Sequence, residues 1–277
     1  MNALGYFKLG RRRSVKTVLE PRLRLIMFGF AGGTVTALHS LAEALPTSIE
    51  VWGAEYPGRG MRWREKLNSG VDDLLADLRA GLYMLDELPL AFLGYSMGAN
   101  VAYRLALSTT PKNLCAFIAM SARPPIHQAD QWESAQLSDA QLIAKLDGLG
   151  GIPAEILNNS AILEEFLPVM RADLSVCADF SHFKVEPLPC PIFMLEGRDD
   201  KLLLNANAQL WLDVAGGDAQ ASKHRLYDGG HFFHKGREHH VAEELSTWLL
   251  ERLEQTSSAA SSTRHTQEVN IASLDRS

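Results

Sequence analysis

A serine set between two glycines is the residue of this chain best suited to nucleophilic chemistry. The segment Gly-Tyr-Ser-Met-Gly at residues 94–98 follows the apolar run 90–93 and precedes an alanine-rich stretch of helical character. A serine at the tip of a strand-to-helix turn is held in a strained backbone conformation, and its flanking residues must be small because strand and helix approach closely. Gly94 and Gly98 supply that room, so the pattern predicts Ser96 as a nucleophile.

A serine nucleophile needs a histidine as its base, because the hydroxyl is weakly nucleophilic at neutral pH. In the α/β-hydrolase layout this histidine comes last in the chain, after an acid. His231 follows two glycines beyond the last predicted strand, and the glycines leave room for a projecting ring. Among the nine histidines, His234 lies close enough to compete, but the pattern assigns it to the start of the next helix. Order and spacing therefore favour His231.

The acid is expected in the turn 197–200, which follows the predicted strand Pro191–Glu196. This turn carries two carboxylates, Asp199 and Asp200. One of them can point at the imidazole, and the other is free to cap the following helix or pair with Arg198. A turn offers no periodicity, so the residues alone leave this choice open.

The oxyanion that develops during acyl transfer needs two backbone N–H groups. One is expected from Met97, the residue after the nucleophile, and the other from the loop after an early strand. The strand 23–28 is followed by the glycine-rich loop Gly29–Thr34. Such a loop can also cradle phosphate, but its glycines match neither G-x-G-x-x-G nor G-x-x-x-x-G-K-[ST]. The oxyanion interpretation is therefore favoured.

Short apolar runs alternate with helical patterns, which predicts an α/β fold with a mostly parallel sheet and helices on both faces. Several runs are apolar throughout, as expected of strands covered on both faces. The predicted strands are 23–28, 49–52, 90–93, 114–120, 191–196 and 222–227. The predicted helices between and after them are 35–45, 71–88, 99–108, 205–215 and 237–253.

The alternation predicts one catalytic domain over residues 23–254 with a helical insertion at about 125–189. This insertion contains helix-like pieces at 139–146, 153–158 and 161–176, and its place beside the nucleophile favours a lid over a mere helical decoration. Residues 1–22 are interpreted as a basic leader rather than a binding patch. Residues 255–277 are expected to form a disordered tail, because they are rich in serine, threonine and alanine without periodicity.

Composition excludes several other classes. The 277 residues carry a formal net charge of −6, which gives no electrostatic basis for binding nucleic acid. Three cysteines without metal-ligand spacing are expected to be reduced packing residues. No signal peptide and no apolar run long enough for a bilayer is apparent, so a cytoplasmic location without membrane association is expected.

Seven segments in the same order resemble the type II thioesterases that accompany nonribosomal peptide and polyketide synthetases. They are residues 30–33, 56–60 with Arg62, 94–99, 121–125, 167–168 with 171–173, 197–200 and 229–233. The resemblance implies an α/β-hydrolase fold and identifies the acid as Asp200, the last residue of a G-x-x-D turn. It also maps the oxyanion N–H groups to Met97 and Ala31.

The resemblance further implies hydrolysis of acyl thioesters from the phosphopantetheine arm of carrier protein domains, which clears a stalled synthetase. It implies no metal and no organic cofactor, and a monomer is expected. For Arg59 and Arg62 we expect loop-fixing roles, and for residues 171–173 an internal ion pair or a helix surface rather than chemistry. Two positions depart from the family pattern: Gly29 replaces a usual proline, and Tyr95 replaces a common histidine.

Two other functions fit part of the pattern. A carboxylesterase or lipase acting on small oxygen esters would use the same triad, because its attacking chemistry is the same. A binding protein that retains the fold without catalysis would not need all of the predicted residues, and this chain carries them all.

Overall fold

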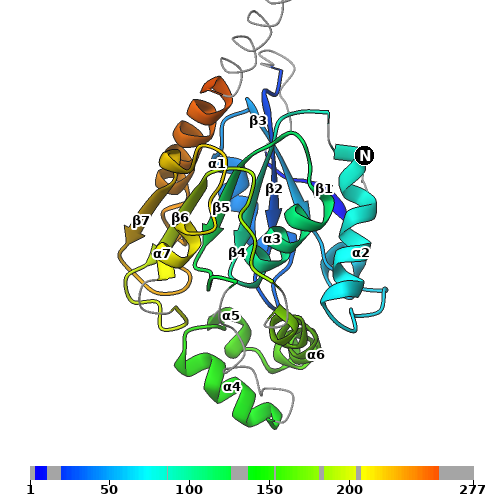
Figure 1. Ribbon diagram of the computed structural model, residues 1–277. Coiled ribbons are helices and arrows are strands. Elements are labelled where there is room, and N and C mark those ends of the chain that lie inside the picture. Colours follow the sequence, from blue (N-terminus) through cyan, green and yellow to red (C-terminus); the bar gives the residue numbers. More distant parts are fainter. Residues whose placement is uncertain are drawn as a thin grey trace, which may run out of the picture.

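A seven-stranded sheet forms the centre of the molecule (Figure 1). The computed structural model describes residues 4–10, 20–85, 87–125, 137–152, 154–180, 184–203 and 207–255. The strands are β1 (Tyr6–Lys8), β2 (Leu23–Phe28), β3 (Ile49–Ala54), β4 (Leu90–Tyr95), β5 (Leu114–Met120), β6 (Ile192–Gly197) and β7 (Lys223–Tyr227). Their order across the sheet is β1-β3-β2-β4-β5-β6-β7, and every neighbouring pair except β1–β3 is parallel. The predicted mostly parallel sheet is confirmed.

Helices cover both faces of this sheet. They are η1 (Val35–Leu38), α1 (His39–Ala44), η2 (Gly60–Arg62), α2 (Val71–Leu82), η3 (Tyr83–Leu85), α3 (Met97–Thr109), α4 (Asp139–Gly148), α5 (Ala154–Leu157), α6 (Ser160–Asp179), α7 (Asn207–Leu212), η6 (Ala219–Ala221) and a final helix over 238–255. One core cluster joins α2, α3 and α7 to one face, and a second joins α1 and the final helix to the other.

Alternate residues of β4 enter these two clusters. Leu90 and Phe92 face the side of α2 and α3, whereas Ala91, Leu93 and Tyr95 face the side of the final helix. All six residues of β4 are buried. A strand covered on both faces needs apolar residues throughout, which is why the sequence shows an unbroken apolar run here.

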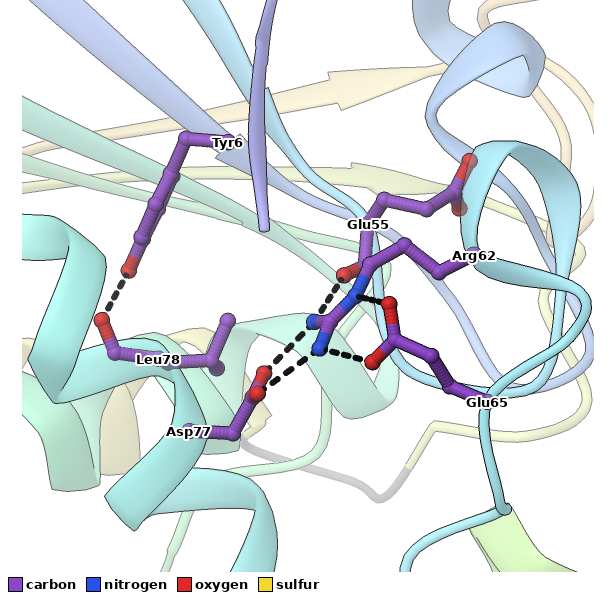
Figure 2. A network of polar contacts seen from close by, with 6 residues as sticks. All are labelled: Tyr6, Glu55, Arg62, Glu65, Asp77 and Leu78. Atoms are coloured by element: carbon purple, nitrogen blue, oxygen red, sulfur yellow. Dashed lines mark hydrogen bonds and ion pairs between the residues drawn. The ribbon is translucent and has the colours of Figure 1, made fainter. Parts of the chain in front are cut away.

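The strand β1 was not predicted from the sequence. It pairs antiparallel with β3, and the buried Tyr6 hydroxyl donates to the Leu78 carbonyl of α2 over 3.0 Å (Figure 2). This strand lies within the segment interpreted as a leader, so part of that segment belongs to the sheet. The domain start at residue 23 stays a prediction, and the basic run 11–13 and the predicted tail from 256 lie outside the described residues.

The described residues of the predicted insertion form helices α4, α5 and α6, which gather at one end of the sheet (Figure 1). A separate apolar cluster joins α4 to α6 through Leu142, Leu146 and a stretch of α6 that runs from Phe166 to Leu174. The C-terminal end of α6 differs, because Val176 and Cys177 belong to the main core. Within the described part of the chain, no helix is long and apolar enough to cross a membrane.

Candidate active site

Ser96 occupies the sharp turn between β4 and α3, as predicted. Its backbone has φ 53° and ψ −119°, a conformation that costs about 1–3 kcal/mol for a residue other than glycine. The Ser96 N–H donates to the Met120 carbonyl at the end of β5 over 2.8 Å. This bond fixes the turn at the carboxyl edge of the sheet and places the hydroxyl beyond the end of β4.

The structure brings His231 and Asp200 together. His231 Nδ1 lies 2.8 Å from Asp200 Oδ2, and the two side chains are 4% and 0% exposed. The second carboxylate oxygen, Oδ1, accepts the Leu202 N–H over 3.0 Å. With Asp200 accepting through Oδ2, Nδ1 carries the imidazole proton, and Nε2 is left as the acceptor that a base requires.

Asp199 points elsewhere. Its side chain is exposed, and its backbone N–H donates to the Gly229 carbonyl over 2.9 Å. That backbone bond and the bond from Arg198 N–H to the Tyr227 carbonyl join the turn after β6 to the turn after β7. The geometry therefore favours Asp200 as the acid, as the family resemblance implies.

Tyr95, one of the two departures from the family pattern, contacts the histidine directly. Its hydroxyl donates to the His231 carbonyl, and its ring lies edge-on to the imidazole with centroids 5.8 Å apart. The ring also stacks on Phe232 and meets Phe30 edge-on at 5.5 Å. Burial raises the pKa of Tyr95 well above its usual value, so the phenol stays protonated and able to donate. Tyr95 thereby connects β4 to the backbone of His231.

The loop Gly29–Thr34 is fixed by contacts at several points. The Gly29 carbonyl accepts the Tyr56 hydroxyl over 3.2 Å, and the Gly32 N–H donates to Asp173 Oδ2 over 2.7 Å. Just beyond the loop, the Val35 N–H donates to Glu55 Oε1 over 3.2 Å. Among the hydrogen bonds of the described residues, the N–H groups of the two predicted oxyanion donors, Ala31 and Met97, have no protein partner.

The loop after β3 supplies some of these contacts and is itself fixed by Arg62. This side chain binds both oxygens of Asp77 over 2.6 and 2.7 Å, Glu65 over 2.9 Å and the Glu55 carbonyl over 3.0 Å (Figure 2). Arg59 binds both carboxylate oxygens of Asp173. Both arginines thus make the loop-fixing contacts that were predicted, and Asp173 forms a buried ion pair, one of the two alternatives predicted for residues 171–173.

Two acidic residues near the site, Glu55 and Asp173, were not assigned a role toward the loop. Glu55 is buried, and burial raises its pKa, while its carboxylate accepts the N–H groups of Val35 and Met61. The sequence position of Glu55 could have indicated a role near the site, because Glu55 directly follows a buried strand at the carboxyl edge of the sheet. Asp173 gave no such signal, since its partner Gly32 lies 141 residues away in sequence.

A pocket of about 510 Å³ lies beside the glycine-rich loop. Its walls come from that loop, the loop after β3, the first half of α6 and the residues after His231. The lining residues are Phe30, Gly32, Gly33, Thr34, Ala37, Gly58, Arg59, Gly60, Trp63, Ile156, Ile162, Glu165, Phe166, Val169, His234 and Lys235. Ser96 and His231 are not part of this lining, whereas Phe30 and His234, which both contact Tyr95, are.

His234, the competing histidine of the sequence analysis, is buried in the wall of this pocket. It lies edge-on to Tyr95 with ring centroids 5.0 Å apart. Burial lowers the pKa of His234 to about 4, and the charges of Lys235 and His231 act in the same direction, while Glu238 opposes them. His234 is therefore neutral at neutral pH, and the carboxylate pairing observed at His231 does not occur here.

We expect Tyr95→Phe to lower the stability of the protein and its turnover together. The change leaves the buried His231 carbonyl without its donor, which costs about 1–3 kcal/mol in the free energy of unfolding. Since His231 then loses a positional constraint, kcat on a p-nitrophenyl ester should fall roughly tenfold with little change in KM. Thermal unfolding and steady-state kinetics measure both effects.

Tyr227→Phe is the matched control, because it removes a hydroxyl that donates to Glu244 over 2.8 Å, away from the histidine. It should alter stability and leave kcat unchanged. Equal losses of kcat in the two variants would show that Tyr95 does not position His231.

A second prediction concerns acid stability. Because the pKa of His234 is lower in the folded than in the unfolded protein, the unfolded state binds more protons between pH 6.5 and about 4. Stability therefore falls as pH drops through this range, by about 3 kcal/mol when complete. In His234→Leu this contribution is absent, so denaturant unfolding at pH 7 and pH 4.5 should show a smaller difference than in the parent protein. The exposed His239→Leu is the control, and an unchanged difference in His234→Leu would refute the assignment.

Comparison with known proteins agrees with this geometry. The profile of the thioesterase domain family matches residues 23–249. Gramicidin S biosynthesis protein GrsT of Aneurinibacillus migulanus is 30% identical over 216 residues, which cover 76% of this chain and 83% of that protein. Thioesterase PikA5 of Streptomyces venezuelae is 30% identical over 236 residues, 82% of this chain and 81% of that protein.

Solved structures give the same result. The type II thioesterase BorB from the borrelidin biosynthetic cluster superposes with a TM-score of 0.76 at 25% identity, covering 90% of this chain and 99% of that one. The predicted α/β-hydrolase fold and the resemblance to type II thioesterases are thereby confirmed. With its sheet order, its strained serine turn and a family match over most of its length, the chain belongs to the thioesterase domain family.

Proposed function

We propose that this thioesterase hydrolyses acyl thioesters held on the phosphopantetheine arm of carrier protein domains in a nonribosomal peptide or polyketide synthetase. The hydrogen bond between His231 and Asp200, at the same sheet edge as the strained Ser96, is the observation that carries the hydrolytic chemistry. The substrate class is supported by the relatives, among them a gramicidin S biosynthesis protein and a thioesterase of the borrelidin cluster.

In the proposed acylation step, the Ser96 oxygen attacks the thioester carbonyl while His231 Nε2 accepts the hydroxyl proton. Asp200 stabilises the imidazolium that forms. The N–H groups of Ala31 and Met97 donate to the oxyanion of the tetrahedral intermediate. The carbon–sulfur bond then breaks, and His231 returns the proton to the departing pantetheine thiolate, leaving an acyl ester on Ser96.

Deacylation repeats these roles with water as the nucleophile and Ser96 as the leaving group. His231 accepts a proton from water as the water oxygen attacks the ester carbonyl, and the same N–H groups bind the second oxyanion. Collapse of this intermediate releases the free acid, and the proton from His231 restores the Ser96 hydroxyl. No step of this scheme needs a group other than the named residues, the substrate and water.

The pocket beside the glycine-rich loop supports this proposal, because its volume of about 510 Å³ falls in the range of small-molecule sites. Apolar side chains from the first half of α6, including Ile162 and Phe166, form one wall. An acyl chain or the arm that carries it would find apolar contacts there. We propose that α4, α5 and the first half of α6 act as the lid over this space.

The acid assignment allows a direct test, since Asp199 and Asp200 are adjacent and only one contacts the histidine. Asp200→Asn should lower kcat by about 10⁴, because an amide cannot fix the imidazole tautomer or stabilise its positive charge. Asp199→Asn should keep kcat close to that of the parent enzyme. Ser96→Ala should lose about 10⁴ to 10⁶ in kcat. A fully active Ser96→Ala or Asp200→Asn enzyme would exclude the proposed triad.

The substrate class is tested by comparing the kcat/KM values of a thioester and an oxygen ester. We expect kcat/KM for an acyl-phosphopantetheinyl carrier protein to exceed that for a p-nitrophenyl ester of the same acyl chain, because binding of the arm contributes to transition-state stabilisation. A strong preference for the oxygen ester would instead support the carboxylesterase alternative. Measuring both substrates with Ser96→Ala separates enzyme turnover from background hydrolysis.

A further inference from the structure

A carboxylate from the lid region reaches into the loop that is proposed to bind the oxyanion. Asp173 belongs to the second half of α6, and its Oδ2 accepts the Gly32 N–H over 2.7 Å. Gly32 follows Ala31, the proposed oxyanion donor. Its φ of +76° is a backbone conformation that residues with a side chain rarely adopt. The contact therefore lies one residue from the group expected to bind the oxyanion.

Arg59 keeps this carboxylate in place. Its guanidinium binds both oxygens of Asp173, with Nη2 2.7 Å from Oδ1, and the two side chains are 3% and 1% exposed. Two parallel bonds of this kind fix the orientation of a carboxylate as well as its position. Arg59 also lies over the ring of Tyr56 at 5.3 Å, and the Tyr56 hydroxyl binds the Gly29 carbonyl at the start of the same loop.

Apolar side chains of α6 press on the loop at the same residue. A β-carbon added to Gly32 would lie 2.2 Å from Phe166 and 3.0 Å from Met170. Gly32 is thus enclosed by one turn of α6 on its apolar side and by Asp173 on its polar side.

Because a peptide unit is planar, fixing one of its groups fixes the other. The Gly33 N–H holds the Phe30 carbonyl over 2.9 Å, which orients the peptide plane containing the Ala31 N–H. The Asp173 carboxylate holds the Gly32 N–H, which orients the next plane. Ala31 therefore lies between two peptide planes that are each anchored by a hydrogen bond.

We propose that Asp173 is a positioning residue for the oxyanion hole, acting through the Gly32 N–H on the direction of the Ala31 N–H. Arg59 serves this role by holding the carboxylate. The proposal rests on the proposed function, since it assumes that Ala31 donates to the oxyanion. In this proposal Asp173 itself does not contact the reacting atoms.

A matched pair of double variants separates positioning from structural support. Arg59→Met/Asp173→Leu and Arg59→Met/Asp173→Asn both remove the ion pair, and neither leaves a charge buried alone, which would be strongly destabilising. The two side chains are similar in size, and the asparagine oxygen can still accept the Gly32 N–H, whereas leucine cannot. Turnover of an N-acetylcysteamine acyl thioester and inhibition by a trifluoromethyl ketone with the same acyl chain are measured for both.

We expect the leucine variant to show a kcat about 10- to 100-fold below that of the asparagine variant, with KM values within about threefold. The inhibition constant of the ketone should rise by the same factor as kcat falls, because its adduct with Ser96 carries an oxyanion. Equal kcat values and equal inhibition constants in the two variants would overturn the proposal and leave the ion pair a purely structural role.

Ser96→Ala on the same thioester distinguishes failure of the proposal from failure of the proposed function. If Ser96→Ala is inactive while the two double variants turn over alike, only the positioning role is lost. Asp179→Leu is the control for α6, because Asp179 also accepts a backbone N–H, that of Val71 over 3.0 Å, away from the loop. It should change stability without changing kcat or ketone affinity.

Amide exchange in the unmodified enzyme decides the question if neither double variant folds. With the hydrogen bond to Asp173 in place, the Gly32 amide should exchange at least about 100-fold more slowly than a free loop amide. Exchange at the free rate would overturn the proposal.

Discussion

The close approach of α3 to the end of β2 is the constraint on which the rest of the site depends. A β-carbon on Gly98 would lie 2.2 Å from the Phe28 carbonyl oxygen and 2.5 Å from that of Gly29. Only glycine at this position lets the first turn of α3 meet the start of the glycine-rich loop. The helix can then begin directly after Ser96. The strained backbone of Ser96 is supported by buried residues on both sides. The same contact brings Met97 beside the loop that contains Ala31.

The other parts of the site come from strand ends that hydrogen bonds join to one another. Ser96 N–H binds the end of β5, Ser121 N–H binds the Leu195 carbonyl of β6, and Arg198 N–H binds the Tyr227 carbonyl of β7. Each turn thus rests on the next strand across the sheet, so the relative positions of Ser96, Asp200 and His231 follow from the strand order. Tyr95 adds a connection between the first and the last of these, from β4 to the His231 carbonyl.

The sequence could predict the parts of this arrangement that have a local signal. The parallel strands appear as apolar runs because both faces are buried, and the serine turn and His231 are recognised by their neighbouring glycines. Asp199 and Asp200 could not be separated from the residues alone, because their directions depend on bonds between two turns. β1 was missed because three residues are too few to show a pattern, and because the strand depends on pairing with β3. The contact of Asp173 with Gly32 spans 141 residues and leaves no local pattern.

Helix α6 both lines the pocket and supports the core of the domain, whereas a simple lid would only cover the pocket. Its first half forms a wall of the pocket, while its second half contributes Val176 and Cys177 to the core, and Asp173 holds the glycine-rich loop. A rigid outward motion of the whole helix would break the buried pair with Arg59 and withdraw both Phe166 and Asp173 from Gly32. Opening of the pocket by that motion would therefore also remove the support of the proposed oxyanion donor. Substrate entry that preserves the contacts at Gly32 would therefore involve movement of α4, α5 or the start of α6, before Phe166.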